Sequence, residues 1–135
     1  MGAGISTPRC FSMVPLHSLP AEDPRIRGTV EAIWRGLARE RWLLRYGNDD
    51  GLGTPSVAFI VCTFWLIEAL GMSERRKEAR TLLERARTVL SPIGLLSEDY
   101  DVSTRRLWGN FPQAYSHVGL IHAAFEAGLR WADVL

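Results

Sequence analysis

Two segments of this chain are apolar on nearly every side when they are read as helices, and they constrain the fold more than any other feature. The first runs from about Ser56 to Leu70 and the second from about Gln113 to Ala127. A helix without a polar face must be covered on all sides by other parts of a protein. A chain of 135 residues is long enough for one small domain, but two outer helices are too few to cover two such segments. We therefore predict that the chain is part of something larger.

Each apolar segment follows an amphipathic one. Asp23, with proline next to it, is a helix-start signal, and the apolar residues that recur after it predict a helix to about Glu40. A second amphipathic helix is predicted from Ser73, as its N-cap, to about Leu90. Gly71 is expected to end the apolar helix that comes before it, and Gly128 the last one.

This order of segments predicts an all-α fold in which surface and buried helices alternate. No segment shows the strict alternation that marks a half-buried strand. The stretch from Ile93 to Pro112 has no clear period and predicts a loop of about 20 residues, a length that is usually functional inside a compact domain. Residues 1–18 are predicted to be irregular, which leaves 19–135 as the folded part. Stacked helix pairs of this kind build solenoids or closed toroids.

Composition and charge exclude several classes of function. The formal net charge of +1 argues against a general nucleic-acid binder, whose surface is strongly basic. The most apolar run, Val57–Ile67, is too short to span a bilayer, and residues 1–11 lack the apolar stretch of a signal peptide. We therefore expect no nucleic-acid partner, no membrane partner and a cytoplasmic location.

The cysteines and histidines give no sign of metal or cofactor chemistry. Cys10 and Cys62 are too few for a disulfide framework and lack the spacing of metal ligands. Cys62 lies inside an apolar segment, so we expect an inert buried thiol. His117 and His122 lie on a helix that should be buried and have no third ligand, so we expect core histidines with satisfied hydrogen bonds. The sequence thus predicts no metal site and no cofactor.

A cluster of three acids lies in the predicted long loop. Glu98, Asp99 and Asp101 occur within four positions, between two predicted helices. Carboxylates on a loop that is fixed by rigid helices are a common way to place a catalytic acid or base. A solvated acidic turn explains the same spacing, so the cluster alone does not decide between the two interpretations.

Aromatic and polar side chains then alternate around the predicted start of the last helix, over Leu107–His117. Such mixtures bind sugars, because aromatic faces stack on the C–H face of a sugar ring while amides and hydroxyls bond its hydroxyl groups. A helix start with ordinary core aromatics is the alternative for this segment when it is read alone.

Together these segments closely resemble glycoside hydrolase family 15, the glucoamylase-like enzymes, which include bacterial trehalases and glucodextranases. The resemblance is carried by Leu95–Asp101, Trp108–Ser116, Phe59–Leu66, Asp49–Gly53 and Asp23–Arg25, in this family's order and at its expected distances. It runs from about Leu19 to Leu135, and several motifs in order at plausible spacing make it specific.

The resemblance implies an (α/α)6 toroid, in which outer and inner helices alternate as the hydrophobic pattern does here. This chain would be the C-terminal part of that catalytic domain, with about four of its twelve helices. It also implies the removal of terminal glucose from α-linked glucosides, glucan or trehalose, with inversion. The residues that select the second sugar are largely outside this chain, so both substrates stay open.

The same resemblance places the general base on Glu98, in the Ser-Glu-x-Tyr-Asp motif. A glutamate is ionised at neutral pH and can accept a proton from water. For the α-glucoside substrate it implies contacts from Arg45, Trp108 and Tyr115, with Asp49 or its neighbour Asp50 at the same rim. Arg45 alone fits a surface salt bridge equally well. Further residues that are expected to line the pocket or support the base are Asn110, Gln113 and Ser116.

Two departures from the family pattern bear on what this chain does by itself. The family's general acid lies in an earlier part of the toroid, which this chain lacks, and Ser56 stands where many relatives carry Glu. We therefore expect the chain to be inactive alone and to self-associate through its exposed inner helices. The alternative hypothesis is a non-catalytic helical remnant or an interaction module.

Overall fold

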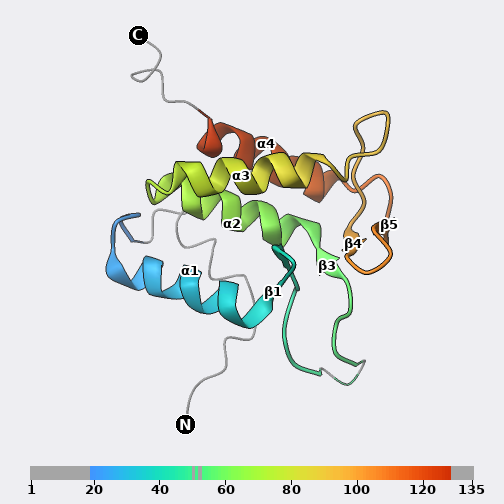
Figure 1. The fold of residues 1–135 in the computed structure, drawn as a ribbon, viewed down its shortest axis with the longest axis horizontal. Coiled ribbons are helices and arrows are strands. Elements are labelled where there is room, and N and C mark those ends of the chain that lie inside the picture. The colour runs from blue at the N-terminus through green and yellow to red at the C-terminus, as the bar shows by residue number, and fades with distance from the viewer. Residues whose placement is uncertain (1–18, 50, 52, 129–135) are drawn as a thin grey trace.

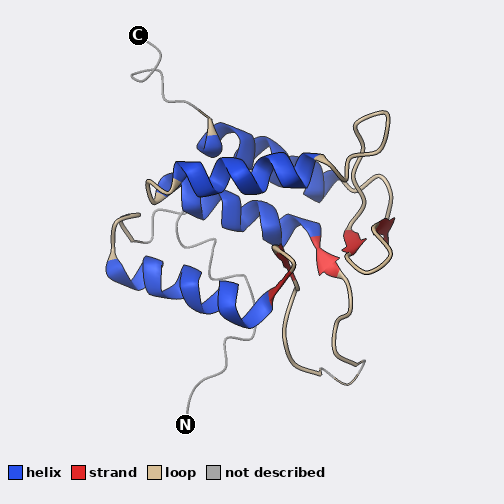
Figure 2. Cartoon of the chain, viewed as in Figure 1, coloured by secondary structure: helices blue, strands red, loops and turns tan. Residues whose placement is uncertain are grey.

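Four helices account for about half of the residues described by the structure, a computed structural model that covers residues 19–49, 51 and 53–128. They are α1 (Pro24–Leu37), α2 (Ile60–Met72), α3 (Arg76–Arg87) and α4 (Ala114–Ala127). Figure 1 shows α2 in the middle, with α1 on one side of it and α3 and α4 on the other, and Figure 2 shows the short strands toward one end. Among the described residues, no helix is long and apolar enough to cross a bilayer. The segment 1–18, predicted to be irregular, lies outside the described residues.

Helix α1 begins as the sequence predicts and ends earlier than expected. The carboxylate of Asp23 caps it by accepting a hydrogen bond from the backbone N–H of Arg25 at 2.8 Å, and proline occupies the first helical position. The predicted end near Glu40 is wrong, because the chain leaves the helix at Leu37 and turns back through a left-handed Glu40, with a φ of 47°. The strands of this turn are β1 (Ala38–Arg39) and β2 (Trp42–Leu43), which pair antiparallel.

Helix α2 is covered almost completely within this chain. Of its 13 residues, 11 are buried, and the apolar face of α1 belongs to the same core. The buried residues of that face are Ile26, Val30, Ile33 and Leu37. The prediction that the chain cannot cover an apolar helix is therefore wrong for α2. The helix begins at Ile60 rather than near Ser56, because residues 58–59 first form a strand.

Two glycines bring α2 and α4 into close contact. A Cβ on Gly71 would lie 2.6 Å from the backbone oxygen of Glu126, and one on Gly119 would lie 3.0 Å from the Cβ of Phe64. Both positions therefore require glycine because of the opposing helix. Gly71 lies inside α2, which ends at Met72, so the expectation that this glycine ends the helix is wrong.

Helix α3 starts later than predicted and caps the end of α4. Ser73, expected as its N-cap, instead follows the last residue of α2, and α3 begins at Arg76. The guanidinium of Arg76 donates to the carbonyl oxygens of Glu126 and Gly128 at 2.9 and 3.0 Å. The guanidinium of Arg80 donates to the last carbonyl of α4 at 3.0 Å. These bonds satisfy carbonyl groups that a helix end leaves free, and the positive charges suit the C-terminal end of the helix dipole. Gly128 is the C-cap of α4, as predicted.

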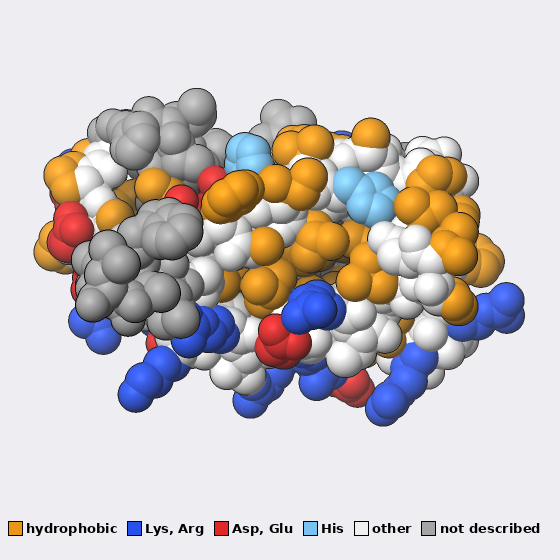
Figure 3. Space-filling model, turned by 90° about the horizontal axis from the view of Figure 1, so that it is seen from above, with side chains coloured by type: hydrophobic (Ala, Val, Ile, Leu, Met, Phe, Trp, Pro, Cys, Tyr) orange, Lys and Arg blue, Asp and Glu red, His pale blue; other side chains and the backbone are white. Residues whose placement is uncertain are grey.

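Helix α4 buries only one side, so the expectation that it is buried all round is wrong within this chain. The buried residues are small: Ser116, Gly119, Ala123 and Ala127. Gly119 lies against Phe64 and Val61 of α2. Large apolar side chains point outward instead, and Phe125 is 79% exposed. We call these exposed residues, Tyr115, Val118, Ile121 and Phe125, the α4 apolar face. Figure 3 shows hydrophobic side chains gathered on the upper side of the molecule, where α4 lies in Figure 1.

The long loop predicted over 93–112 contains a β-hairpin, so the prediction of no strands is wrong. The strands β4 (Asp99–Asp101) and β5 (Arg106–Trp108) pair antiparallel, and β3 (Ala58–Phe59) pairs with the other edge of β4. Each has two or three residues, which is too short for alternation of polar and apolar residues to be recognised. The sheet lies where α2 and α4 begin (Figure 1).

The α4 apolar face generates a first prediction, about self-association. Exposed apolar area of this kind favours association, because each Å2 removed from water contributes about 25 cal/mol. Changing Val118, Ile121 and Phe125 together to Gln should reduce association and binding of the dye ANS without lowering the melting temperature. Ala123→Gln is the control that should unfold the chain, because Ala123 lies on the same helix and is fully buried. Sedimentation of the wild-type chain as a monomer that binds no ANS contradicts the prediction.

A second prediction tests the contact between α2 and α4. Gly71→Ala should lower the free energy of unfolding by about 1–3 kcal/mol, because the new methyl group overlaps the backbone of Glu126. Gly28→Ala is the matched control. Gly28 also lies inside a helix, but nothing lies within 4 Å of the position of its Cβ, so alanine should be neutral or stabilise by up to about 1 kcal/mol. Urea denaturation measures both changes, and equal effects of the two substitutions would be the contrary result.

Candidate active site

The segment that carries Glu98 is fixed by backbone hydrogen bonds to three different elements. The N–H of Ile60, at the start of α2, donates to the carbonyl of Glu98 at 3.0 Å, and the N–H of Glu98 donates to the carbonyl of Asn110 at 2.9 Å. Just before α4, the N–H of Gln113 donates to the carbonyl of Leu96 at 2.9 Å. The backbone around Glu98 is therefore held in place by the first residue of α2 and by the residue that precedes α4.

Buried hydroxyl and imidazole groups complete this support. Ser116 donates from Oγ to the carbonyl of Ser97 at 2.7 Å, and the hydroxyl of Ser97 donates to the carbonyl of Asp99. His117 Nε2 accepts from the N–H of Leu96 at 3.3 Å. The expectation that His117 has a satisfied hydrogen bond is thus confirmed. The role of Ser97 was missed by the sequence reasoning, although the residue precedes Glu98 in the motif.

The side chain of Glu98 is partly exposed, and its carboxylate has a direct polar partner. Its Oε2 accepts a hydrogen bond from the side-chain amide of Asn110 at 2.7 Å. An amide donor can stay bonded to a carboxylate whose other oxygen faces a ligand or water. Asn110 was among the residues that the sequence pointed to as support for the base, and the structure places it in contact with Glu98.

Gly109 brings the carboxyl groups of Glu98 and Asp99 near one another. Its φ is +75°, and a Cβ at this position would lie 3.0 Å from Asp99 Oδ2 and 3.4 Å from Glu98 Oε2. Both carboxyl groups therefore approach the space that a side chain at this position would fill. This role of Gly109 was not predicted from the sequence, where the residue is only a glycine between Trp108 and Asn110.

Asp99 lies in an environment that disfavours its charge. Partial burial raises its pKa to about 6, the negative charge of Glu98 adds to the increase, and the guanidinium of Arg45 opposes it. Arg45 itself lies with its guanidinium carbon 5.2 Å from the centre of the Phe59 ring. Phe59 pairs with Asp99 in the sheet, so Arg45 lies over a strand neighbour of Asp99 and its positive charge acts on that carboxyl.

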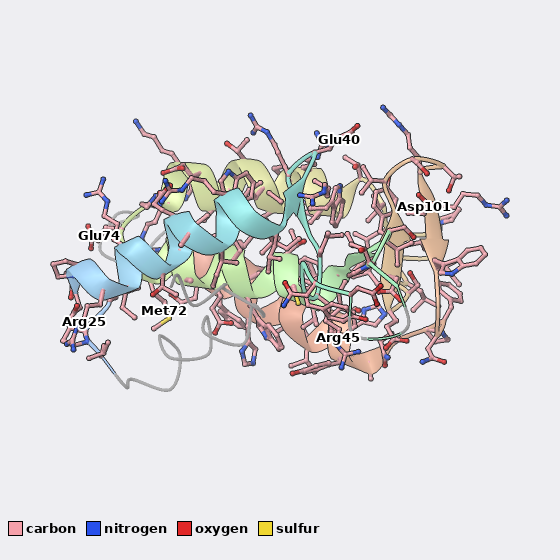
Figure 4. All side chains as sticks on the ribbon, turned by 90° about the horizontal axis from the view of Figure 1, so that it is seen from below. Arg25, Glu40, Arg45, Met72, Glu74 and Asp101 are labelled. Atoms are coloured by element: carbon pink, nitrogen blue, oxygen red, sulfur yellow. The ribbon has the colours of Figure 1, made fainter. Side chains whose placement is uncertain are left out.

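The third acid of the cluster has a local role. The carboxylate of Asp101 accepts hydrogen bonds from Ser103 and Thr104 in the turn between β4 and β5. These bonds lower its pKa to about 2. Figure 4 shows Asp101 toward one end of the molecule and Arg25 at the opposite end, with Arg45 between them and nearer to Asp101. The acidic cluster thus separates into a pair, Glu98 and Asp99, and a turn-forming residue, Asp101.

The two aromatic residues that were expected to contact the substrate are both exposed. Trp108, which pairs with Asp99 across the sheet, is 61% exposed, and Tyr115 is half exposed with its ring edge-on to Trp65 at 5.7 Å. Asp49 is engaged in its own loop, since its Oδ1 accepts from the N–H groups of Gly51 and Gly53. Asp50, the other residue expected at this rim, lies outside the described residues.

The expectation for His122 is wrong, and the expectation for Cys62 agrees with the structure. His122 is exposed, so the expectation of a core histidine is wrong, because the α4 apolar face around it is uncovered in this chain. Its Nδ1 lies 3.6 Å from the buried carboxylate of Glu68. Cys62 is buried, and burial raises its pKa to about 12, which agrees with an inert thiol. Among the described residues, no three side chains of the metal-binding types form a cluster.

Comparison with known families identifies the chain at this point. The model of "Glycosyl hydrolases family 15" matches residues 8–125. The chain belongs to this family. The resemblance read from the motifs is therefore confirmed at the level of the family, and the residues that form the sheet and the starts of α2 and α4 all lie within the match.

Two similar proteins carry the name trehalase. The chain is 44% identical over 108 residues to a trehalase of Mycolicibacterium smegmatis, which covers 78% of this chain and 16% of the relative. It is 42% identical over 110 residues to a trehalase of Thermoplasma acidophilum, with 81% of this chain and 19% of the relative covered. The chain thus spans less than a fifth of the length of these relatives.

Solved structures share the fold at lower identity. One described as "Glycosidase Wild Type" matches with a TM-score of 0.75 at 19% identity and covers 90% of this chain and 35% of that one. Another, "Glycosidase E178A", matches with a TM-score of 0.72 at 21% identity, with 89% and 34% covered. The four helices and small sheets described here are therefore an arrangement that also occurs inside larger glycosidases.

A third prediction tests the space between the two carboxyl groups. Gly109→Ala should destabilise the fold through a strained φ and through contact with Asp99 and Glu98. Gly94→Ala is the control, because Gly94 also has a positive φ but nothing lies within 4 Å of its Cβ position. We expect the control to cost about 1–2 kcal/mol for the backbone alone, and Gly109→Ala to cost more. Thermal and urea unfolding measure the difference, and an equal cost at both sites would show that the carboxyl groups do not crowd Gly109.

Proposed function

We propose that this chain carries the general base of an inverting α-glucoside hydrolase, and that the base is Glu98. The observation that carries the proposal is the fixed position of Glu98: backbone bonds to the start of α2 and to Asn110 hold its main chain, and an amide holds one carboxylate oxygen. In this role the carboxylate takes a proton from a water molecule while that water attacks the anomeric carbon. A separate carboxylic acid protonates the leaving oxygen on the opposite face.

The substrate contacts follow from the same arrangement. Trp108, which pairs with Asp99 across the sheet, and Tyr115 are exposed and offer ring faces on which a glucose unit can stack. Arg45 supplies N–H donors for sugar hydroxyl groups, and Asp49 shapes the loop that would border the substrate. The names of the relatives favour trehalose as the α-glucoside, and a glucan is the alternative.

We further propose that the chain forms the C-terminal part of an (α/α)6 toroid. In that domain α2 and α4 are inner helices, and the α4 apolar face is covered by helices that this chain does not contain. The short share of each relative that the chain covers supports this proposal. The general acid then comes from the rest of the domain, and the chain alone is inactive. A non-catalytic interaction module is the second candidate, and the exposed α4 apolar face is the observation that favours it.

A chimeric enzyme tests the proposed base. In the chimera, the 108 residues of this chain that align with the Mycolicibacterium smegmatis trehalase replace the corresponding segment of that enzyme. The chimera is assayed with trehalose. Glu98→Gln should keep the fold and lower kcat by about 10²–10⁴-fold with little change in KM, because an amide accepts no proton from water.

Asp101→Asn is the matched control. Asp101 lies on β4, which begins just after Glu98, and its carboxylate bonds Ser103 and Thr104 in its own turn. We expect it to keep activity within a few-fold of the unsubstituted chimera. Equal activity of the chimera with and without Glu98→Gln, both correctly folded by circular dichroism, shows that Glu98 is not the base.

A further inference from the structure

Asp99 follows the proposed base directly in the chain. It occupies the variable position x of the Ser-Glu-x-Tyr-Asp motif, so the motif assigns it no role. Its side chain is half-buried, and its strand neighbours are Phe59 on one side and Trp108 on the other. Its Oδ2 and the Oε2 of Glu98 lie 3.0 and 3.4 Å from one point, the missing Cβ of Gly109. Like charges this close repel one another, and the charge of Glu98 adds to the effect of burial in raising the pKa of Asp99.

The charged and titratable groups around Asp99 come from three elements. Glu98 lies on the same segment, Arg45 lies on the loop after β2, and Cys62 lies on α2. The thiol of Cys62 stays neutral, because burial and the charge of Asp99 both raise its pKa. The positive charge that acts on Asp99 comes from Arg45. Its guanidinium lies over Phe59, the residue that pairs with Asp99.

We propose that Asp99 is a positioning residue for the base: its carboxylate keeps the side chain of Glu98 turned toward Asn110. The inference rests on the proposed function of Glu98. The physical cause is repulsion between like charges, which directs Glu98 to the nearest neutral donor, the Asn110 amide at 2.7 Å. The negative charge of Asp99 also favours an oxocarbenium-like transition state, which is positively charged.

This role has a definite pH dependence. The pKa of Asp99 is raised to about 6, chiefly by burial, so the carboxyl is neutral well below this pH and ionised above it. Activity that depends on its charge therefore increases as the pH rises through about 6. Asp99→Asn, which stays neutral, should lose that increase.

The same shift has the opposite effect on stability. A carboxyl whose pKa is higher in the folded chain than in the unfolded chain makes the folded state less stable as the pH rises from the ordinary value of 3.8 to about 6. At neutral pH, Asp99→Asn should therefore stabilise the chain, since the charge that burial disfavours is gone. A residue that is merely structural would lower stability when replaced.

The experiment combines both readouts. Urea unfolding of the full 135-residue chain is measured at pH 4 and pH 7.5 for wild type, Asp99→Asn and Asp101→Asn. The kcat/KM of the trehalase chimera is measured from pH 4.5 to 8 for the same three forms and for Glu98→Gln. We expect Asp99→Asn to be more stable than wild type at pH 7.5 only. In the chimera it should lose about threefold to tenfold in kcat/KM above pH 6, well below the loss from removing a base, with KM unchanged.

Two results overturn the inference. One is a pH profile of Asp99→Asn with the same shape as that of the unsubstituted chimera. The other is destabilisation by Asp99→Asn at both pH values, which makes Asp99 a structural residue. Failure of the proposed function looks different, because the Glu98→Gln chimera would then be active whatever Asp99→Asn does.

Discussion

Helix α2 has no polar face, and the need to cover it organises the rest of the described structure. The apolar face of α1 packs on one side of it, and α3 and α4 pack on the other. Its first N–H groups are free to bond outside the helix, and that of Ile60 bonds the carbonyl of Glu98. The same helix that forms the core thus also fixes the main chain of the proposed base. A change in the packing of α2 is therefore expected to move the site.

The contact between α2 and α4 divides the residues of α4 by size. The small residues are buried, with Gly119 against α2, so the two backbones approach closely, while the large apolar side chains are left on the outside. Glu68 is the exception to the apolar character of α2. Burial raises its pKa, and the nearby His122 on α4 opposes this. In a larger helical domain the exposed side of α4 is where further helices would pack, and the imidazole and carboxylate would then be buried as a pair.

Much of the fold could be predicted from local chemistry, and the failures have identifiable causes. The capping geometry of Asp23 predicted the start of α1, because an N-cap depends on neighbouring residues alone. The positions of Gly71 and Ser73 were misread because a glycine near a helix end suggests a terminus, whereas Gly71 is required by the opposing helix. The strands were missed because two or three residues have no visible period, and their pairing joins segments about 40 residues apart in the chain, at Phe59 and Asp99.

The candidate site was predictable only in part. The motif around Glu98 pointed to a base through its resemblance to a family, and not through spacing, since the same acids fit a solvated turn. The structure separates the three acids by their partners, which no pattern in the sequence reports: Asp101 bonds its own turn, and Asp99 lies next to Glu98. Trp108 and Tyr115 are exposed as a ligand-binding role requires, while the engagement of Asp49 in its loop depends on the fold of residues 49–53.

The anomeric form of the first product tests the central claim, that Glu98 activates water on the face opposite the leaving group. Trehalose joins two α-glucose units, so attack by water with inversion yields one β-glucose, and the leaving unit keeps its α form. Proton NMR within the first minutes of reaction of the chimera, before mutarotation mixes the two forms, should show α- and β-glucose in equal amounts. Release of α-glucose alone would contradict the account, because it requires retention and therefore a different role for Glu98.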